Sequence, residues 1–163
     1  MRLAIIVSGV FLATSILQVQ ARDEGFAGRW VLDKKSQLPG NAPNNLETRI
    51  KQDGSGVTIE STFKEPENGI VPLLYLGIMT TRMHLGTTGI EEQNTIGPFQ
   101  MASRTTLNGN QMETDWTAVV KGDQVQGHWT HKLSDDGRRM TLEIKESSTQ
   151  GQNAQATLYF VKK

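Results

Sequence analysis

The sequence predicts an all-β protein, an antiparallel up-and-down β-barrel of eight to ten strands. Three observations favour this fold class: apolar residues recur at every second position, short glycine-containing turns separate these runs, and no stretch shows an amphipathic helical period. Strands that follow one another through short turns pair as antiparallel neighbours, and closing them into a barrel removes the exposed edges of an open sheet. A β-sandwich is the alternative architecture.

The N-terminal segment has the pattern of an export signal. Met1 and Arg2 precede the apolar run Leu3–Leu17, and Val19-Gln20-Ala21 follows, with small residues near the cleavage point. The run is about 15 residues long and contains serine and threonine, whereas a membrane-spanning helix needs about 20 apolar residues. We therefore expect a signal peptide over residues 1–21 and one domain over residues 22–163. The mature chain, without a transmembrane segment, is expected in a periplasm or outside the cell; an uncleaved anchor is the competing interpretation.

Composition restricts the partners and the chemistry. The chain of 163 residues has no cysteine, so disulfides, a thiol nucleophile and cysteine-bound zinc are excluded. Its 17 basic and 17 acidic residues balance, and without a basic excess we expect no nucleic-acid partner. Charges of mixed sign on outward positions favour a monomer. The last strand, Thr157–Val161, has apolar residues on both faces, so a dimer is the alternative to a monomer.

The first half contains one clear hairpin. Alternating residues predict strands over 46–51 and 57–63, and Asp53-Gly54-Ser55-Gly56 between them has the composition of a reversing turn. The stretch 64–98 is rich in proline and glycine. There we expect strands near 70–84 and 90–96, with a bend or bulge at Gly77.

From about residue 99 to the end, the pattern predicts an uninterrupted antiparallel meander. Its inward positions include many small or hydroxylated residues, as does the first hairpin. They are Thr48, Ser61, Ser103, Thr105, Thr114, Ala118, Gly127, Ala154 and Ala156. Since such residues fill little volume, we expect a pocket inside the barrel. A register slip of one residue would reverse every assignment to the inner or outer face and is the alternative.

Two motifs resemble those of lipocalin-like, calycin-type barrels. Gly28-Arg29-Trp30 opens the first strand, and Trp129 precedes a segment running from Leu133 through Asp135-Asp136-Gly137 to Leu142, similar to a hairpin of exported bacterial lipocalin-like domains of unknown function. The resemblance implies that Gly28 lets the chain enter the barrel closely, that Trp30 plugs its closed end, and that Arg138 or Arg139 covers this ring. The chain lacks the C-terminal helix and second conserved motif of a full lipocalin. The resemblance therefore implies the fold and a general expectation of ligand carriage.

The candidate ligand-binding residues are Trp116, Trp129 and His131, which the alternation places inside the barrel, with Arg104 or Arg82 at the rim. Core packing is the competing role for both tryptophans, and a histidine satisfied by a neighbour is the competing role for His131. His128 and His131 are three apart on a strand and point to opposite faces. We therefore expect no metal site, and nothing in the sequence predicts a cofactor.

Three hypotheses for function follow. The first is an exported barrel that binds a small, mostly apolar molecule in its interior. The second is a filled barrel that acts through its outer surface as a structural or protein-interaction module of the cell envelope. The third, a small hydrolase or isomerase, is least favoured, because no nucleophile elbow or facing pair of carboxylates is found and no catalytic residue is assigned. An interior cavity of about 300 Å³ or more would favour the first over the second.

Overall fold

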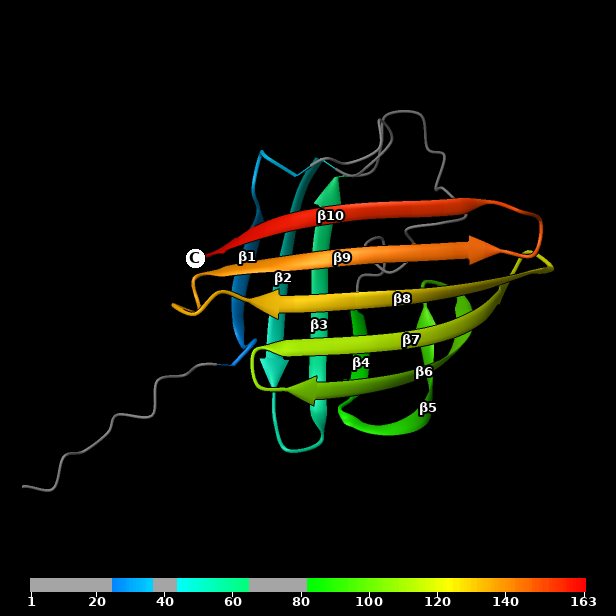
Figure 1. Cartoon of the computed structure of the whole chain (residues 1–163), viewed down its shortest axis with the longest axis horizontal. Coiled ribbons are helices and arrows are strands. Elements are labelled where there is room, and N and C mark those ends of the chain that lie inside the picture. Colours follow the sequence, from blue (N-terminus) through cyan, green and yellow to red (C-terminus); the bar gives the residue numbers. More distant parts are fainter. Residues whose placement is uncertain (1–24, 37–43, 65–81) are drawn as a thin grey trace, which may run out of the picture.

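The computed structural model describes residues 25–36, 44–64 and 82–163, which form ten β-strands (Figure 1). The strands are β1 (Gly28–Leu32), β2 (Asn44–Gln52), β3 (Gly56–Lys64), β4 (Arg82–Gly86), β5 (Thr88–Ile96), β6 (Phe99–Asn108), β7 (Gln111–Val120), β8 (Asp123–Leu133), β9 (Arg139–Ser148) and β10 (Asn153–Lys162). These residues contain no helix. The expected signal peptide and the expected bend at Gly77 lie outside the described residues.

All ten strands belong to one antiparallel sheet, in the order β4-β3-β2-β1-β10-β9-β8-β7-β6-β5. Strands that follow one another in sequence pair with each other, except β4 and β5, which form the two ends of the sheet. In addition, β1 pairs with β10. The Glu92 carboxylate of β5 accepts a hydrogen bond of 2.9 Å from the Gly86 N–H of β4. The predicted up-and-down barrel is therefore confirmed, with ten strands and a nearly closed wall.

The predicted hairpin is β2–β3, with Gln52 opposite Val57. In its turn, Asp53 Oδ1 accepts hydrogen bonds from the N–H groups of Ser55 (2.8 Å) and Gly56 (3.2 Å). Together with the Ser55 hydroxyl, these donors lower the pKa of the Asp53 carboxyl. Asp53 thus fixes the backbone of the turn through its carboxylate, which the same hydrogen bonds keep ionised.

The predicted meander is β6 to β10, and burial alternates along each of its strands as the sequence pattern requires. In the stretch 64–98, the strand expected near 90–96 is confirmed as β5, and β4 coincides with the end of the strand expected near 70–84, the rest of which lies outside the described residues. Strands β4 and β5 are separated only by Thr87 and begin at Arg82 and Thr88. β5 begins two residues before the expected strand and ends where it was expected to end, although Thr88–Ile96 carries polar residues on both faces and alternates weakly.

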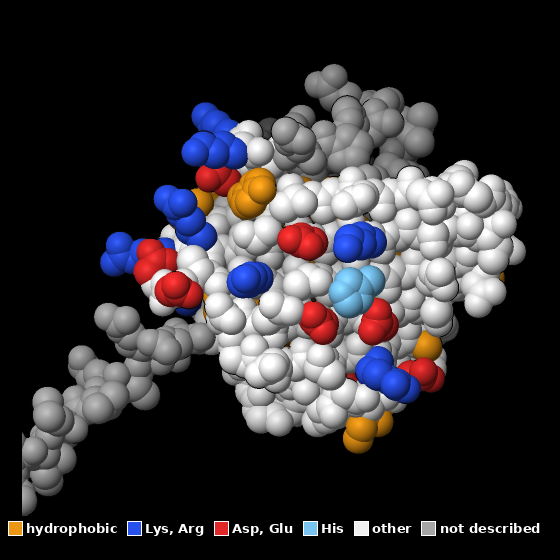
Figure 2. Space-filling view, viewed as in Figure 1, with side chains coloured by type: hydrophobic (Ala, Val, Ile, Leu, Met, Phe, Trp, Pro, Cys, Tyr) orange, Lys and Arg blue, Asp and Glu red, His pale blue; other side chains and the backbone are white. Residues whose placement is uncertain are grey.

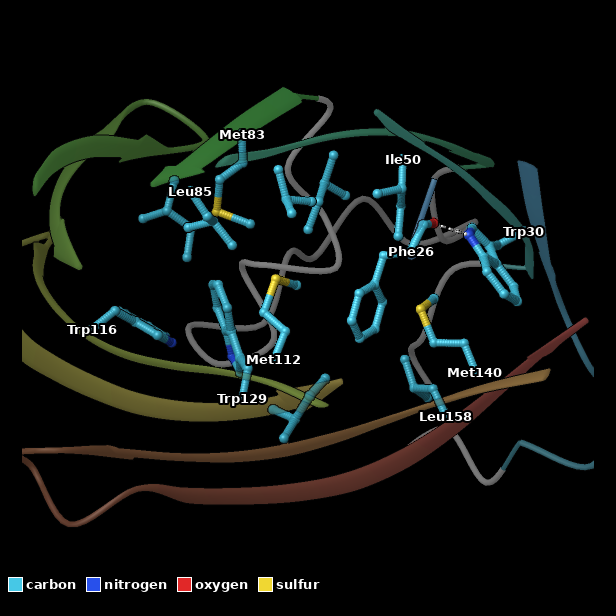
Figure 3. Packing of buried hydrophobic residues seen from close by; sticks show 14 of the residues in the cluster. Phe26, Trp30, Ile50, Met83, Leu85, Met112, Trp116, Trp129, Met140 and Leu158 are labelled. Carbon is cyan, nitrogen blue, oxygen red and sulfur yellow. Dashed lines mark hydrogen bonds between the residues drawn. The ribbon is translucent and has the colours of Figure 1, made fainter. Parts of the chain in front are cut away.

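One end of the barrel is filled by Trp30, which is fully buried and whose indole N–H donates to the Phe26 carbonyl at 2.9 Å (Figure 3). The Lys162 ammonium lies 5.3 Å from the centre of the Trp30 ring, within reach of a cation–π contact. Lys162, and not Arg138 or Arg139, covers this ring because β10 places it opposite Trp30. Gly28 has φ of 149°, and a Cβ there would lie 2.5 Å from Lys162 Cε. The Gly28-Arg29-Trp30 motif therefore has two roles: Gly28 lets the chain pass close to Lys162, and Trp30 fills the end of the barrel.

Candidate functional site

Two tryptophans from adjacent strands lie inside the barrel (Figure 3). Trp116 of β7 and Trp129 of β8 are both 3% exposed, and their ring centres are 5.1 Å apart. The Trp129 indole N–H donates to the buried carboxylate of Glu146 at 3.0 Å, whereas the Trp116 indole N–H has no hydrogen-bond partner. An unpaired N–H in a dry interior is costly, so the Trp116 indole is a donor that lacks an acceptor.

His131 is the third sequence-predicted residue in the interior. It is 5% exposed, its ring meets Phe26 edge to face at 6.4 Å, and its Nδ1 is buried without a partner. Burial lowers the pKa of His131 to about 4. The imidazole is therefore neutral near pH 7, and its Nδ1 is available to a hydrogen-bonding group inside the barrel.

The hydroxylated inward positions bond mainly to one another. The hydroxyl oxygens of Thr48 and Ser61 are 3.2 Å apart, and those of Thr105 and Thr114 are 3.0 Å apart, so each pair is hydrogen-bonded. Each pair joins directly opposed residues of neighbouring strands. The predicted inward direction of these residues is confirmed, but their hydroxyls first satisfy each other.

The enclosed cavity beside His131 is small. It has a volume of about 30 Å³, and its walls include Thr48, Ser61, Met83, Trp129 and His131. A volume of this size holds one or two water molecules, and ligand pockets usually exceed about 300 Å³. In this conformation, the cavity bounded by these described residues has no room for a carried molecule.

The two arginines expected at the rim do not point into the interior. Arg104 is exposed between the buried residues Ser103 and Thr105, so its side chain lies on the outer face of β6. Arg82, at the start of β4, is also exposed and lies 4.0 Å from the Glu60 carboxylate. Neither residue joins Trp116, Trp129 and His131.

Arg104 instead lines a cleft of about 840 Å³ at strands β5 to β10. Its lining combines outward side chains with the buried, inward residues Ser103, Trp116 and Glu146. Asp115 and His128 lie beside Arg104 on β7 and β8, and Figure 2 shows acidic and basic side chains and a histidine interspersed on the outer face. His128 Nδ1 is 2.7 Å from Asp115 Oδ1, and His128 Nε2 is 3.2 Å from the Thr130 hydroxyl. Outward His128 and inward His131 thus take part in two separate environments.

Groups of three or more histidine, cysteine or acidic side chains placed to hold a metal ion are absent from the described ranges. No helix within these ranges is long and apolar enough to cross a membrane. The interior residue that sequence reasoning missed is Glu146, which is 5% exposed. The signal for it was present, because Glu146 continues the inward series Met140, Leu142 and Ile144 along β9.

We predict that Gly127→Ala destabilises the fold by about 1–3 kcal/mol. A Cβ at Gly127 would lie 2.3 Å from Trp116 Nε1, so the indole would have to move. Gly54→Ala is the matched control, since a Cβ at Gly54 meets no atom within 4 Å. Urea unfolding measures both variants, and equal stability of G127A and the parent would contradict this packing of Trp116.

The buried position of His131 predicts how the free energy of unfolding depends on pH. Its pKa lies at about 4 in the folded protein and at 6.5 ordinarily, so between these values the unfolded chain binds a proton that the folded protein does not. The free energy of unfolding therefore falls as the pH is lowered through this window, by about 3 kcal/mol in total from this residue. Urea unfolding at several pH values should show a flatter dependence for His131→Leu than for the parent. Parallel curves would show that His131 is not buried as a neutral ring.

No protein-family model matches this chain, and no curated protein matches it. Several solved structures resemble it. A secretary abundant heat soluble (SAHS) protein from Ramazzottius varieornatus shares 10% identity at a TM-score of 0.53, covering 85% of this chain and 95% of that one. A mutant of the fluorescent protein UnaG shares 14% identity at a TM-score of 0.48, covering 85% and 96%. The first resemblance and the strand order identify the fold as a calycin-like antiparallel β-barrel.

Proposed function

We propose that this chain is exported, with residues 1–21 as its signal peptide, and that its barrel binds a small, mostly apolar molecule bearing one polar group. The ligand would lie against Trp116, Trp129 and His131. Among the described residues, three buried side-chain polar atoms lack a hydrogen-bond partner: Trp116 Nε1, His131 Nδ1 and Asp123 Oδ2. The observation that carries the proposal is that two of them, Trp116 Nε1 and His131 Nδ1, belong to inward-facing rings. Native interiors pair nearly all such atoms, so two orphans on inward-facing rings indicate that a further group belongs there.

The chemistry of the wall suggests what this group is. The Trp116 indole can only donate a hydrogen bond, and a neutral imidazole nitrogen donates or accepts according to its tautomer. A hydroxyl or carbonyl group satisfies either one. The rest of the wall is apolar or already hydrogen-bonded, as in the Trp129–Glu146 and Thr105–Thr114 contacts. The ligand should therefore be apolar over most of its surface.

Space for the ligand would come from methionine side chains. Met83, Met112 and Met140 are buried and point into the interior (Figure 3). Methionine is unbranched and has three rotatable side-chain bonds, so it fills gaps and repacks at low cost. The absence of a hydrogen-bonded ladder between β4 and β5 makes that part of the wall easier to open. We infer that the small cavity beside His131 is the unliganded state of a larger one.

Native mass spectrometry of the chain purified untagged from an exporting host tests this function. We expect an additional mass of a few hundred daltons that is lost on unfolding. The emptied protein should then bind saturably the lipophilic dye 6-propionyl-2-(dimethylamino)naphthalene, whose carbonyl oxygen can accept a hydrogen bond from the Trp116 indole. Trp116→Phe should weaken dye binding by about 2- to 10-fold, because it removes one hydrogen-bond donor and keeps an aromatic ring.

Trp30→Phe is the matched control. It removes the same kind of N–H from the plug, where the donor already bonds to the Phe26 carbonyl, so dye affinity should not change. Absence of both a bound mass and saturable dye binding would overturn the proposal. An equal loss of affinity in both variants would also overturn it, because the effect would then come from general destabilisation.

A further inference from the structure

We propose that the outer face of the barrel carries a second binding site, for a neutral polyhydroxylated molecule such as an oligosaccharide. The site is the cleft of about 840 Å³ at strands β5 to β10. The charged side chains that carry the proposal point away from the barrel interior, whereas the buried side chains of Trp116 and Glu146 also line the cleft. The two sites are therefore distinguished by Trp129 and His131, which line the interior cavity and not the cleft.

The cleft is built from a row of opposed residues that runs across the strands. Glu91, Arg104, Asp115, His128 and Lys145 come from β5, β6, β7, β8 and β9, and each is directly opposite the next in the strand register. Neighbouring strands are about 4.8 Å apart, so the row spans about 19 Å. This length suits a chain of several sugar rings laid across the strands.

A second, parallel row supplies uncharged hydrogen-bonding groups. Thr117, Gln126, Ser147 and Asn153 line the cleft on β7, β8, β9 and β10. Amide side chains both donate and accept hydrogen bonds, and hydroxyls do the same. Sugar hydroxyls need partners of both kinds, which this row provides side by side.

The charges favour a neutral ligand. Arg104 and Lys145 are balanced by Glu91 and Asp115, so the outer row has no net charge to attract a polyanion. In the described part of the chain, neither Arg104 nor Lys145 forms a salt bridge, although each has charged or ionisable side chains directly opposite it. Their donors are therefore available to hydroxyl oxygens, and the second oxygen of Asp115 is available to a hydroxyl hydrogen.

His128 supplies a fixed flat surface in the middle of the row. Its two ring nitrogens contact Asp115 Oδ1 and the Thr130 hydroxyl, which sets the orientation of the ring. The side chain remains 40% exposed. A sugar ring presents an apolar C–H face that can pack on an aromatic ring, while its hydroxyls reach the two rows. The absence of large exposed apolar side chains from the lining disfavours a lipid or a hydrophobic peptide.

An amide NMR titration of the folded chain with neutral oligosaccharides of the cello, malto, xylo and chito series tests the proposal. We expect saturable shifts, at millimolar ligand or below, centred on the cleft residues of β6 to β9. Arg104→Ala and Gln126→Ala should each weaken binding by at least about 3-fold. Gln124→Ala is the matched control for Gln126→Ala, because both glutamines are exposed on β8 and only Gln126 lines the cleft.

Three results would overturn the proposal. One is the absence of saturable shifts with every series. A second is binding only to anionic polymers such as heparin, which would make charge the recognised feature. The third is a shift centred on Trp129 and His131, which line the interior cavity and not the cleft, because this would place the sugar inside the barrel. Because Arg104, Gln124 and Gln126 are exposed, their alanine variants should remain folded, and the amide spectra report this directly.

Discussion

The pairing of β1 with β10 holds the barrel together. It joins the first strand to the last, with Trp30 opposite Lys162 and Leu32 opposite Phe160. Without it, the sheet would separate into β1 to β4 and β5 to β10, which are otherwise linked across the wall by the Gly86–Glu92 contact between β4 and β5. The same pairing brings Lys162 over the Trp30 ring and seals one end. The interior can be enclosed because this junction forms.

Successive residues of each strand point to opposite faces of the nearly closed wall, so two neighbouring residues can lie in very different chemical environments. Ser103 faces the interior and Arg104 faces the solvent; His131 is neutral and buried, while His128 is exposed beside Asp115. Alternation of side chains along a strand imposes this separation. The same wall therefore presents mainly apolar and neutral groups inward and charged groups outward, although buried Trp116 also lines the cleft beside Arg104.

Much of this arrangement could be predicted from the sequence, because it depends on local rules. Period-two patterning gave the fold class, the inward direction of Trp116, Trp129 and His131, and the outward direction of His128. The Gly28–Trp30 motif gave the plug. What depends on contacts distant in sequence could not be predicted. Lys162 covers Trp30 through the β1–β10 register, and Glu146 accepts a hydrogen bond from the Trp129 indole. The outward direction of Arg104, by contrast, follows from the local alternation, because Arg104 stands between the inward residues Ser103 and Thr105.

The central claim is that the interior accepts a ligand group at the unpaired Trp116 indole. Its most direct test is the indole N–H NMR spectrum of the three tryptophans during titration with octanol, an apolar chain with one hydroxyl. The Trp30 and Trp129 indoles already donate to the Phe26 carbonyl and to Glu146, so their signals should move little. The account predicts a saturable shift that is largest for Trp116. An unchanged Trp116 signal, or equal movement of all three, would contradict it.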